Sequence, residues 1–414
     1  STDNPQRGLW LLRYGAACNA AGRYQETIDA LTSERRLFNN SSQKAEAHLL
    51  VGQAQLRAGK PEAAAKSLAS SRDADSKWPR AVEASLLEGQ ALLKSGDEGQ
   101  AEARWRELIK SAPGTPMADQ ARYQLAQLAS ANTRFQEAID LYDQILESGK
   151  QANLIPYAHY GKGWGFMQMK RFTPALESLN EVLEQANHPL RPDALLARGI
   201  TLRNLKNYDP AKRDLEEYLE SSPKGTDLGH ALYELALIDQ ADEQPQEAAK
   251  KLERLVREVP DYVAMDKVLY ELGWSLQETG DIPGAVRYFT ALITKFPDTA
   301  LVADAAYFIG QQHYDAEDWG KAAEFFEIAV NKATDPGLSE KAHYRLGWSQ
   351  FKKEDFVKSE KAFAQQASKH SDGRLAFDAL MMVGECRFKR GDYREALNGF
   401  SVARDNIRKN DDTA

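Results

Sequence analysis

The sequence predicts an all-α solenoid, a superhelix of about eleven stacked helical hairpins. Three observations predict this class. A glycine or alanine recurs every 37 residues, with one step of 36; a second small residue follows each of them by twelve positions; and a large residue follows by sixteen. Small residues let two helices approach closely, and a bulky side chain fills the space beside them, so each unit is expected to be an antiparallel pair of helices.

The first small residue of each copy serves as the reference residue, from which other positions in that copy are counted. The reference residues are Gly15, Gly52, Gly89, Ala126, Gly163, Gly199, Ala236, Gly273, Gly310, Gly347 and Gly384. The copies lie near residues 5–39, 40–76, 77–113, 114–150, 151–186, 187–223, 224–260, 261–297, 298–334, 335–371 and 372–409. A hairpin buries its apolar faces only against its neighbours. We therefore expect one domain over residues 1–414.

Each copy is expected to contain a first helix, a short turn and a second helix. In the eighth copy the first helix is predicted over residues 265–279 and the second over residues 282–295, with a turn at Gly280 and Asp281 between them. Pro297 follows the second helix, and proline cannot continue a helix. The equivalent turns, where a left-handed residue is expected, begin at Gly22, Gly59, Gly96 and Gly391.

These residues resemble the tetratricopeptide repeat family. Its small position in the first helix, its alanine and large positions in the second, and its terminal proline have counterparts here, the proline at Pro113, Pro223, Pro260 and Pro297. The usual period of the family is about 34 residues. The longer period here, with extra residues in segments 112–126 and 296–310, looks like a subgroup of bacterial envelope proteins that includes the Tol-Pal accessory protein and outer-membrane assembly lipoproteins. The resemblance implies a right-handed superhelix in the periplasm or cell envelope, with the cytoplasm as the alternative.

In the family that this chain resembles, the first helices line a concave inner wall, so positions −3, +1 and +4 are expected to face a groove. Tyrosine and tryptophan combine a large contact area with a polar group, and both are enriched at binding surfaces. The predicted partner-binding residues are Tyr123, Tyr160, Trp164, Met167, Tyr233, Tyr270, Trp274, Tyr307, Tyr314, Tyr344, Trp348 and Phe351. We therefore expect a non-catalytic scaffold that binds a peptide or protein segment.

Other interpretations of the aromatic residues stay open at this point. Tyrosine at position −3 is also frequent in the family for packing against the next repeat. A ladder of aromatic rings would equally suit a carbohydrate, because rings stack on sugars. The chain would also suit a substrate-recruiting segment of a larger enzyme.

Composition argues against several other classes of protein. No apolar run approaches the roughly 20 residues that span a bilayer. A net charge of −8 argues against nucleic acid as a partner. No catalytic, cofactor or metal site is predicted, because the seven histidines include no pair at the four-residue helical spacing and the two cysteines stand alone. Cys18 and Cys386 are expected to be buried free thiols.

The last copy is expected to lack a capping helix. Residues 408–414 come directly after its second helix, and an uncapped repeat exposes an apolar face. We therefore predict either an end-to-end contact with another chain through this face or a continuation in a longer polypeptide.

Overall fold

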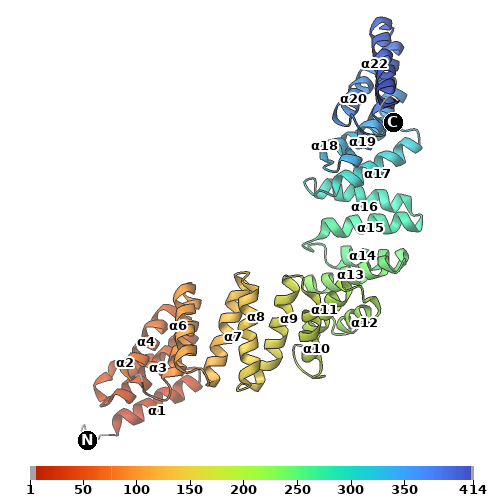
Figure 1. The fold of residues 1–414 in the computed structure, drawn as a ribbon. Coiled ribbons are helices and arrows are strands. Elements are labelled where there is room, and N and C mark those ends of the chain that lie inside the picture. Colours follow the sequence, from red (N-terminus) through yellow and green to blue (C-terminus); the bar gives the residue numbers. More distant parts are fainter. Residues whose placement is uncertain (1–5, 76, 412–414) are drawn as a thin grey trace. The chain divides into compact units, whose positions relative to one another are not determined.

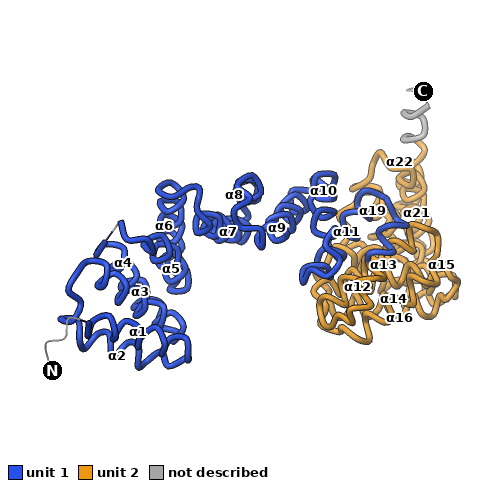
Figure 2. Tube along the Cα trace, turned by 90° about the horizontal axis from the view of Figure 1, so that it is seen from below, with its two compact units in different colours: residues 1–214 blue, residues 215–414 orange. Residues whose placement is uncertain are grey.

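The computed structural model describes residues 6–75 and 77–411, with side chains as far as Arg404. This part of the chain is made of α-helices and short turns, with two short 3₁₀ helices and no β-strand (Figure 1). The predicted all-α helical-repeat class is confirmed. Residues up to 214 and residues from 215 onward form two compact units, which Figure 2 colours separately. A single domain over all 414 residues stays a prediction.

The odd-numbered helices are the first helices of the copies and the even-numbered helices are the second. In the first unit they are α1 (Arg7–Ala20), α2 (Tyr24–Ser33), α3 (Ser41–Arg57), α4 (Pro61–Ala74), α5 (Ala81–Lys94), α6 (Glu98–Ser111), α7 (Pro116–Ala131), α8 (Phe135–Ser148), α9 (Ile155–Gln168), α10 (Phe172–Leu183) and α11 (Arg191–Asn204), with the 3₁₀ helices η1 (Arg35–Leu37) and η2 (Ala152–Leu154). Residue 214 lies in α12 (Tyr208–Glu220). In the second unit they are α13 (Gly225–Ala241), α14 (Pro245–Glu258), α15 (Met265–Thr279), α16 (Ile282–Lys295), α17 (Val302–Asp315), α18 (Trp319–Lys332), α19 (Pro336–Lys352), α20 (Phe356–Lys369), α21 (Ala376–Lys389) and α22 (Tyr393–Asp411). The bounds of α15 and α16 are those predicted for copy eight.

The predicted close contact between the two helices of a hairpin is present in both units. In the second unit Gly273 lies against Phe289, and a Cβ added to this glycine would come within 2.5 Å of the ring. In the first unit a Cβ at Gly163 would come within 2.9 Å of Leu179. Phe289 and Leu179 are fully buried. Because interiors are close-packed, the missing side chain and the large one opposite fix the contact between the helices.

The turn between the two helices contains a left-handed residue at position +7 in all eleven copies. The predicted glycine turns are confirmed, with φ between 72° and 88° at Gly22, Gly59, Gly96, Gly280 and Gly391. Other residues hold the same conformation in the remaining copies, with φ between 56° and 64° at Thr133, Lys170, Lys206, Glu243, Glu317 and Glu354. The turn geometry is therefore constant although the turn sequence varies.

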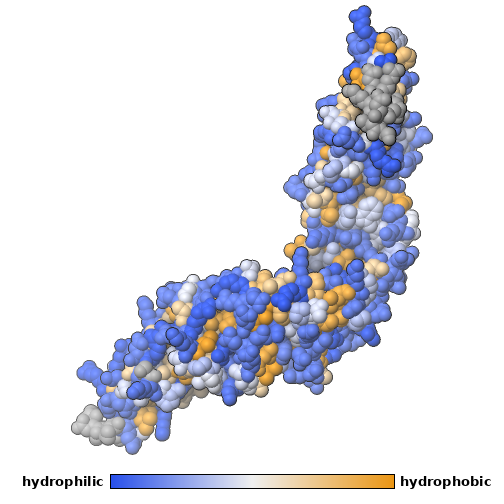
Figure 3. Space-filling model, in the orientation of Figure 1, coloured by the Kyte–Doolittle hydropathy of each residue, from blue (hydrophilic) through white to orange (hydrophobic). Residues whose placement is uncertain are grey.

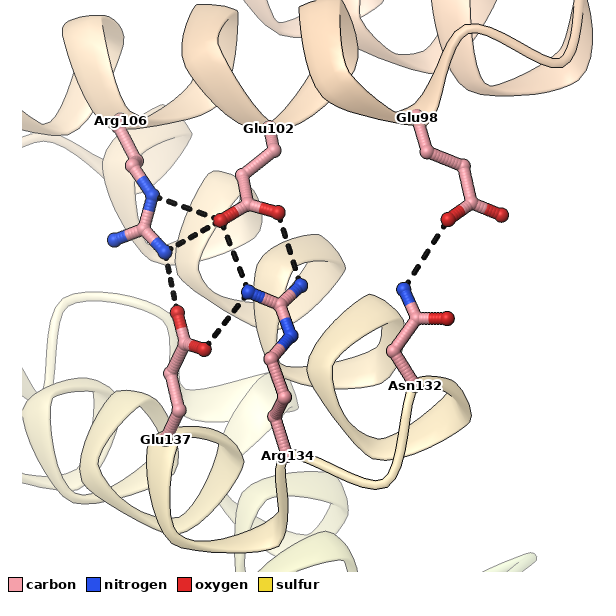
Figure 4. A network of polar contacts seen from close by, with 6 residues as sticks. All are labelled: Glu98, Glu102, Arg106, Asn132, Arg134 and Glu137. Atoms are coloured by element: carbon pink, nitrogen blue, oxygen red, sulfur yellow. Dashed lines mark hydrogen bonds and ion pairs between the residues drawn. The ribbon is translucent and has the colours of Figure 1, made fainter.

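Ion pairs between second helices also join consecutive copies. In the first unit Glu102 and Arg106 of α6 meet Arg134 and Glu137 at the start of α8 (Figure 4). Glu102 accepts hydrogen bonds from Arg134 at 2.9 Å and from Arg106 at 2.6 Å. The Arg134 and Arg106 guanidinium groups lower the pKa of Glu102 to about 2. The network therefore holds copies three and four together through alternating charges.

Both cysteines are buried free thiols, as predicted. The Cys386 thiol donates to the Ser359 hydroxyl at 3.2 Å, and burial raises the pKa of this thiol. Cys386 of copy eleven therefore packs against copy ten.

The face of the molecule drawn in Figure 3 is mainly hydrophilic, with hydrophobic residues in scattered patches. No helix in the described ranges combines the length and the apolar composition that crossing a bilayer requires. On α22, Leu397 is 66% exposed. The side chains of residues 405–411 and the whole of residues 412–414 lie outside the described part of the chain, so the end-to-end contact predicted for this end stays a prediction.

Candidate functional site

The first helices of copies one to three border a groove. A cavity of about 490 Å³ lies against α1, α3 and α5, and no second helix contributes to it. It is lined by Ala16, Asn19, Ala20, Glu46, Leu50, Gln53, Leu56, Arg57, Arg80, Glu83 and Leu87. Apart from Arg80, these residues occupy positions −6, −2, +1, +4 and +5 of their copies. We call this set of positions the first-helix face.

Neighbouring copies contact each other across the first-helix face in a fixed register. Position +1 meets position −6 of the next copy, where Gln53 Nε2 donates to Glu83 Oε1 at 2.9 Å. Position +4 meets position −2 of the next copy, where Asn19 Nδ2 donates to the Leu50 carbonyl at 2.9 Å. In the second unit Gln240 Nε2 donates to the Glu271 carbonyl at 3.3 Å, again from position +4 to position −2. The register between first helices is therefore common to both units.

The tyrosines predicted at position −3 have a packing role. Position −3 does not line the cavity, and the leucines that hold it in copies one to three are buried. The tyrosine rings of copies four, eight, nine and ten are half-buried and lie 5.4 to 6.2 Å from the large residue of their own second helix. These pairs are Tyr123 with Tyr142, Tyr270 with Phe289, Tyr307 with Phe326 and Tyr344 with Phe363. Contact of these tyrosines with a partner stays a prediction.

Two further tyrosines at position −3 are also half-buried. Tyr233 lies 6.3 Å from Tyr262, which precedes the first helix of the next copy. Tyr160 lies in α9. Their role in partner binding likewise stays a prediction.

The tryptophans predicted at position +1 lie on the first-helix face. Trp164 is 41% exposed. Trp274 is half-buried, with its ring 5.3 Å from Phe289 and 5.5 Å from Phe308 in edge-to-face contacts. Trp348 is also half-buried, 5.6 Å from Phe351. The indoles of Trp274 and Trp348 are thus packed against neighbouring rings and remain partly exposed.

Position +4 adds further apolar surface to the same face. Met167 packs on the cluster formed by Ile139 and Phe166. Tyr314 lies 4.9 Å from Trp319, and Phe351 lies 5.3 Å from Phe356. All three side chains at position +4 are half-buried. The predicted residues at positions +1 and +4 therefore belong to the face that lines the cavity in copies one to three.

Charges of both signs lie on the first-helix face of the second unit. The Arg345 guanidinium lies 4.9 Å above the Tyr314 ring, from position −2 of copy ten to position +4 of copy nine. Burial raises the pKa of Glu271, and a hydrogen bond from Gln240 opposes this shift. Burial also raises the pKa of Asp304, and the nearby Asp335 adds to the increase. The charges on this face of the second unit are therefore mixed in sign.

The search for aromatic residues missed the polar part of the face. Glu46, Arg57 and Arg80 line the cavity of copies one to three, and none was predicted as a contact residue. The signal that finds them is positional, because Glu46 holds position −6 and Arg57 holds position +5. Arg80 holds position −9, which the expected groove positions did not include.

The histidines serve packing. Among the described residues, no three histidine, cysteine or acidic side chains gather closely enough to hold a metal ion. His343 is buried, and its Nδ1 lies 2.8 Å from the Ser339 carbonyl. Burial lowers the pKa of His48, His159 and His343. All three therefore favour the neutral form that packing requires.

Comparison with known families decides the class of the repeat. The tetratricopeptide repeat model matches residues 49–101, 86–153, 270–338 and 344–406, which together make up more than half of the chain. The chain belongs to the tetratricopeptide repeat family. A second tetratricopeptide repeat model matches residues 193–225 and 230–262. No curated protein matches the sequence.

Several solved tetratricopeptide repeat proteins are similar in structure. The C-terminal part of a repeat protein from Cytophaga hutchinsonii is 15% identical, with a TM-score of 0.53 over 62% of this chain and 99% of that one. A tetratricopeptide repeat protein from Parabacteroides merdae is 18% identical, with a TM-score of 0.44 over 65% of this chain and 98% of that one. PilW, a type IV pilus biogenesis factor, is 19% identical, with a TM-score of 0.43 over 53% of this chain and 96% of that one. At these identities the likeness shows the fold alone.

A tetratricopeptide repeat array is typically a non-catalytic scaffold for protein–protein interaction, and the repeats of this chain indicate a scaffold for protein–protein interaction. Such an array repeats one backbone contact many times and varies the side chains on it. In this chain the variation on the first-helix face runs from polar side chains in copies one to three to aromatic ones in copies eight to ten.

Proposed function

We propose that the first-helix face binds an extended or helical segment of a partner protein, with Trp164, Trp274 and Trp348 as its main contact residues. The observation that carries this proposal is positional. The positions that line the cavity in copies one to three hold indole and phenyl rings in copies five and eight to ten. Rings that are fixed on one side and open on the other give a large contact area at low entropic cost.

Photo-crosslinking tests which surface the partner touches. A photoreactive amino acid would replace Gln277 or Gln311 on the first-helix face and, as the matched control, the exposed Lys250 on α14. Crosslinks from the first two positions are expected to map to one segment of one partner, with none from position 250. Equal crosslinking from α14 would reject the first-helix face as the binding surface.

Substitution tests the contribution of the indoles. In the double variant Trp274→Ala and Trp348→Ala, partner affinity is expected to fall by at least about 2 kcal/mol, as for central aromatic contacts. The matched control is the double variant Val263→Ala and Val357→Ala, which removes apolar side chains that are 81% and 64% exposed outside the first-helix face. Equal affinity of the two variants, both folded, would remove the proposed role of these tryptophans.

We further propose the bacterial cell envelope as the location of the chain. This proposal is supported by the long repeat period and by segments 112–126 and 296–310, which resemble those of envelope proteins. Fractionation of cells that express the complete gene product tests it. Recovery of the protein only in the cytoplasmic fraction would contradict it.

A further inference from the structure

Each tryptophan at position +1 is matched by an aspartate at position −6 of the next copy. The three pairs are Trp164 with Asp193, Trp274 with Asp304 and Trp348 with Asp378. The hydrogen bond from Gln53 to Glu83 shows that these two positions meet across neighbouring copies. Where position +1 is glutamine in copies two, three, four and nine, position −6 of the next copy holds Glu83, Gln120, Tyr157 and Lys341. An aspartate at position −6 therefore follows each of the three tryptophans and none of these four glutamines.

The surroundings of Trp274 are the most fully built of the three. Tyr270 lies 6.0 Å from the indole in an edge-to-face contact, and Phe289 and Phe308 contact the indole edge to face at 5.3 and 5.5 Å. Glu271 and Asp304 are both half-buried. Burial raises the pKa of Tyr270, a hydrogen bond with Trp274 opposes this shift, and the charges of Asp304 and Glu271 add to the increase. We call Tyr270, Glu271, Trp274 and Asp304 the Trp274 site.

The two carboxylates of the Trp274 site lack a cation of their own. Within the described residues neither Glu271 nor Asp304 forms an ion pair, and Glu271 accepts only from the neutral amide of Gln240, at 3.2 Å. In copy three the equivalent acid, Glu83, is paired with Arg80 at 2.8 Å. Arg80 holds position −9, and copy nine has Leu301 there. The acid at position −6 is therefore neutralised in copy three and left without a counter-charge in copy nine.

Neighbouring charges keep this region acidic. Asp335 lies close enough to Asp304 to raise its pKa further. Lys267 lies one helical turn before Glu271, and Lys341 holds position −6 of copy ten, but within the described residues neither forms an ion pair with Glu271 or Asp304. The two half-buried carboxylates are therefore without a cation of their own.

We propose that the Trp274 site binds the cationic side chain of an arginine or lysine in the partner segment. The cation lies over the face of the indole, which is the ring best suited to a cation–π contact. It donates at the same time to Asp304 or Glu271 in a charge-assisted hydrogen bond. The same face already contains one such contact, the Arg345 guanidinium over Tyr314. The inference rests on the proposed protein-binding function and adds the chemistry of the bound residue.

Four short peptides test this assignment on the whole chain. They are acetyl-Gly-Gly-X-Gly-Gly-amide with X as arginine, lysine, glutamine or glutamate. The protein carries 5-fluorotryptophan at its seven tryptophans, and a Trp274→Phe variant assigns the Trp274 fluorine resonance. The arginine and lysine peptides are expected to shift this resonance, and the glutamine and glutamate peptides at the same concentration are not.

Variants separate the role of charge from that of folding. Asp304→Asn is expected to weaken binding of the arginine peptide about tenfold, the effect of one hydrogen bond to a charged group. Asp304→Glu is expected to retain most of the binding. The matched control Asp298→Asn removes the same charge from an exposed residue that pairs with Lys332 at 3.2 Å, and it is expected to leave binding unchanged. In each variant, unchanged resonances of the six tryptophans other than Trp274 would show that the fold is intact.

The outcomes distinguish this inference from the proposed function. Equal shifts with the glutamine peptide, or full binding by Asp304→Asn, would overturn the cationic assignment. If none of the four peptides shifts the Trp274 resonance, the cationic assignment is overturned as well. Crosslinks from Gln277 to a partner would in that case still support the first-helix face as the binding surface. Binding of the arginine peptide without such crosslinks would support the Trp274 site and reject the wider face.

Discussion

The first-helix face differs between copies one to three and copies eight to ten, although the register between first helices is the same. In copies two and three Gln53 donates to Glu83, and Arg80 pairs with Glu83 and Glu46, so the charges are satisfied within the chain. In copies eight and nine an indole and an unpaired carboxylate take the places of Gln53 and Glu83, at Trp274 and Asp304. In the polar region Arg80 pairs with Glu46 and Glu83, whereas in the aromatic region Trp274 is partly exposed and Asp304 forms no ion pair within the described residues.

This difference shows how one backbone contact supports two kinds of surface. The hairpin packing that holds the face is alike in both regions, since Leu68 in copy two and Phe289 in copy eight are fully buried at the same repeat position. The side chains at positions −9, −6, −3, +1 and +4 differ between the regions, while the pairing of the two helices in a hairpin is kept. The surface chemistry of a copy can therefore vary without a change in its fold.

The largest expected effect comes from removing the support of the aromatic region. Phe289→Ala is expected to lower the free energy of unfolding by about 3–5 kcal/mol, because it leaves a cavity in a close-packed core. Leu68→Ala in copy two is expected to cost about 2–5 kcal/mol for the same reason. Urea denaturation followed by tryptophan fluorescence measures both.

The two variants differ in what they do to the aromatic face. Phe289→Ala also removes a ring that fixes Trp274, so it is expected to broaden or move the Trp274 fluorine resonance, and Leu68→Ala is not. Val357→Ala, at an exposed residue, serves as the control and is expected to change stability by less than about 0.5 kcal/mol. A Trp274 resonance that is equally unaffected by both core variants would contradict the support assigned to Phe289.

The second effect in size concerns the glycine opposite this ring. Gly273→Ala is expected to cost about 1–3 kcal/mol, because the added Cβ overpacks the contact with Phe289. Copy seven has alanine at the reference position, Ala236, opposite the smaller Leu252, and both are buried. The double variant Gly273→Ala and Phe289→Leu should therefore cost less than the sum of its single variants in a denaturant cycle. Strict additivity would show that the two side chains do not share the space.

The helices and their contacts followed from the sequence because each contact repeats. The spacing of a small residue and a large one fixed the bounds of α15 and α16, and glycine at Gly280 marked the turn between them. Six turns without glycine adopt the same left-handed conformation, because the packing of the flanking helices determines the path of the chain there.

The proposed binding face followed from the sequence only in part. The tyrosine rings at position −3 pack on the second helix of their own copy, and their contact with a partner stays a prediction. The unpaired state of Asp304 depends on a contact between copies and on Leu301 in the place of Arg80. This relation depends on which positions of neighbouring copies meet. The pattern of residues within one copy does not give that register.

Acid is expected to weaken the ion-pair network between the second helices of copies three and four. The pKa of Glu102 is lowered to about 2, so its ion pairs stabilise the first unit above the ordinary carboxylate pKa and are lost as the pH falls from about 4.5 toward 2. Glu102→Gln is expected to lower stability at pH 7 by about 1 kcal/mol, since the paired arginines are partly exposed, and to remove this part of the pH dependence. Denaturation at pH 7 and at pH 3 measures both effects, and an unchanged pH dependence would contradict the role given to the network.

The smallest effect is expected at Glu271 and has the opposite sign. Burial raises the pKa of Glu271, so its ionised form is disfavoured in the folded chain, and stability falls as the pH rises from the ordinary carboxylate pKa through the raised one. Glu271→Gln keeps an acceptor for Gln240 and removes the charge, so it is expected to stabilise the second unit at pH 7 by a few tenths of a kcal/mol, about the size of a partly exposed charge interaction. Glu327→Gln, at an exposed residue of α18 that does not act on Glu271, is the matched control and should have a smaller effect. The same Glu271→Gln substitution is expected to weaken binding of the arginine peptide, because it removes one of the two carboxylates proposed to bind the cation. A gain in stability with no loss of peptide binding would assign the cation to Asp304 alone.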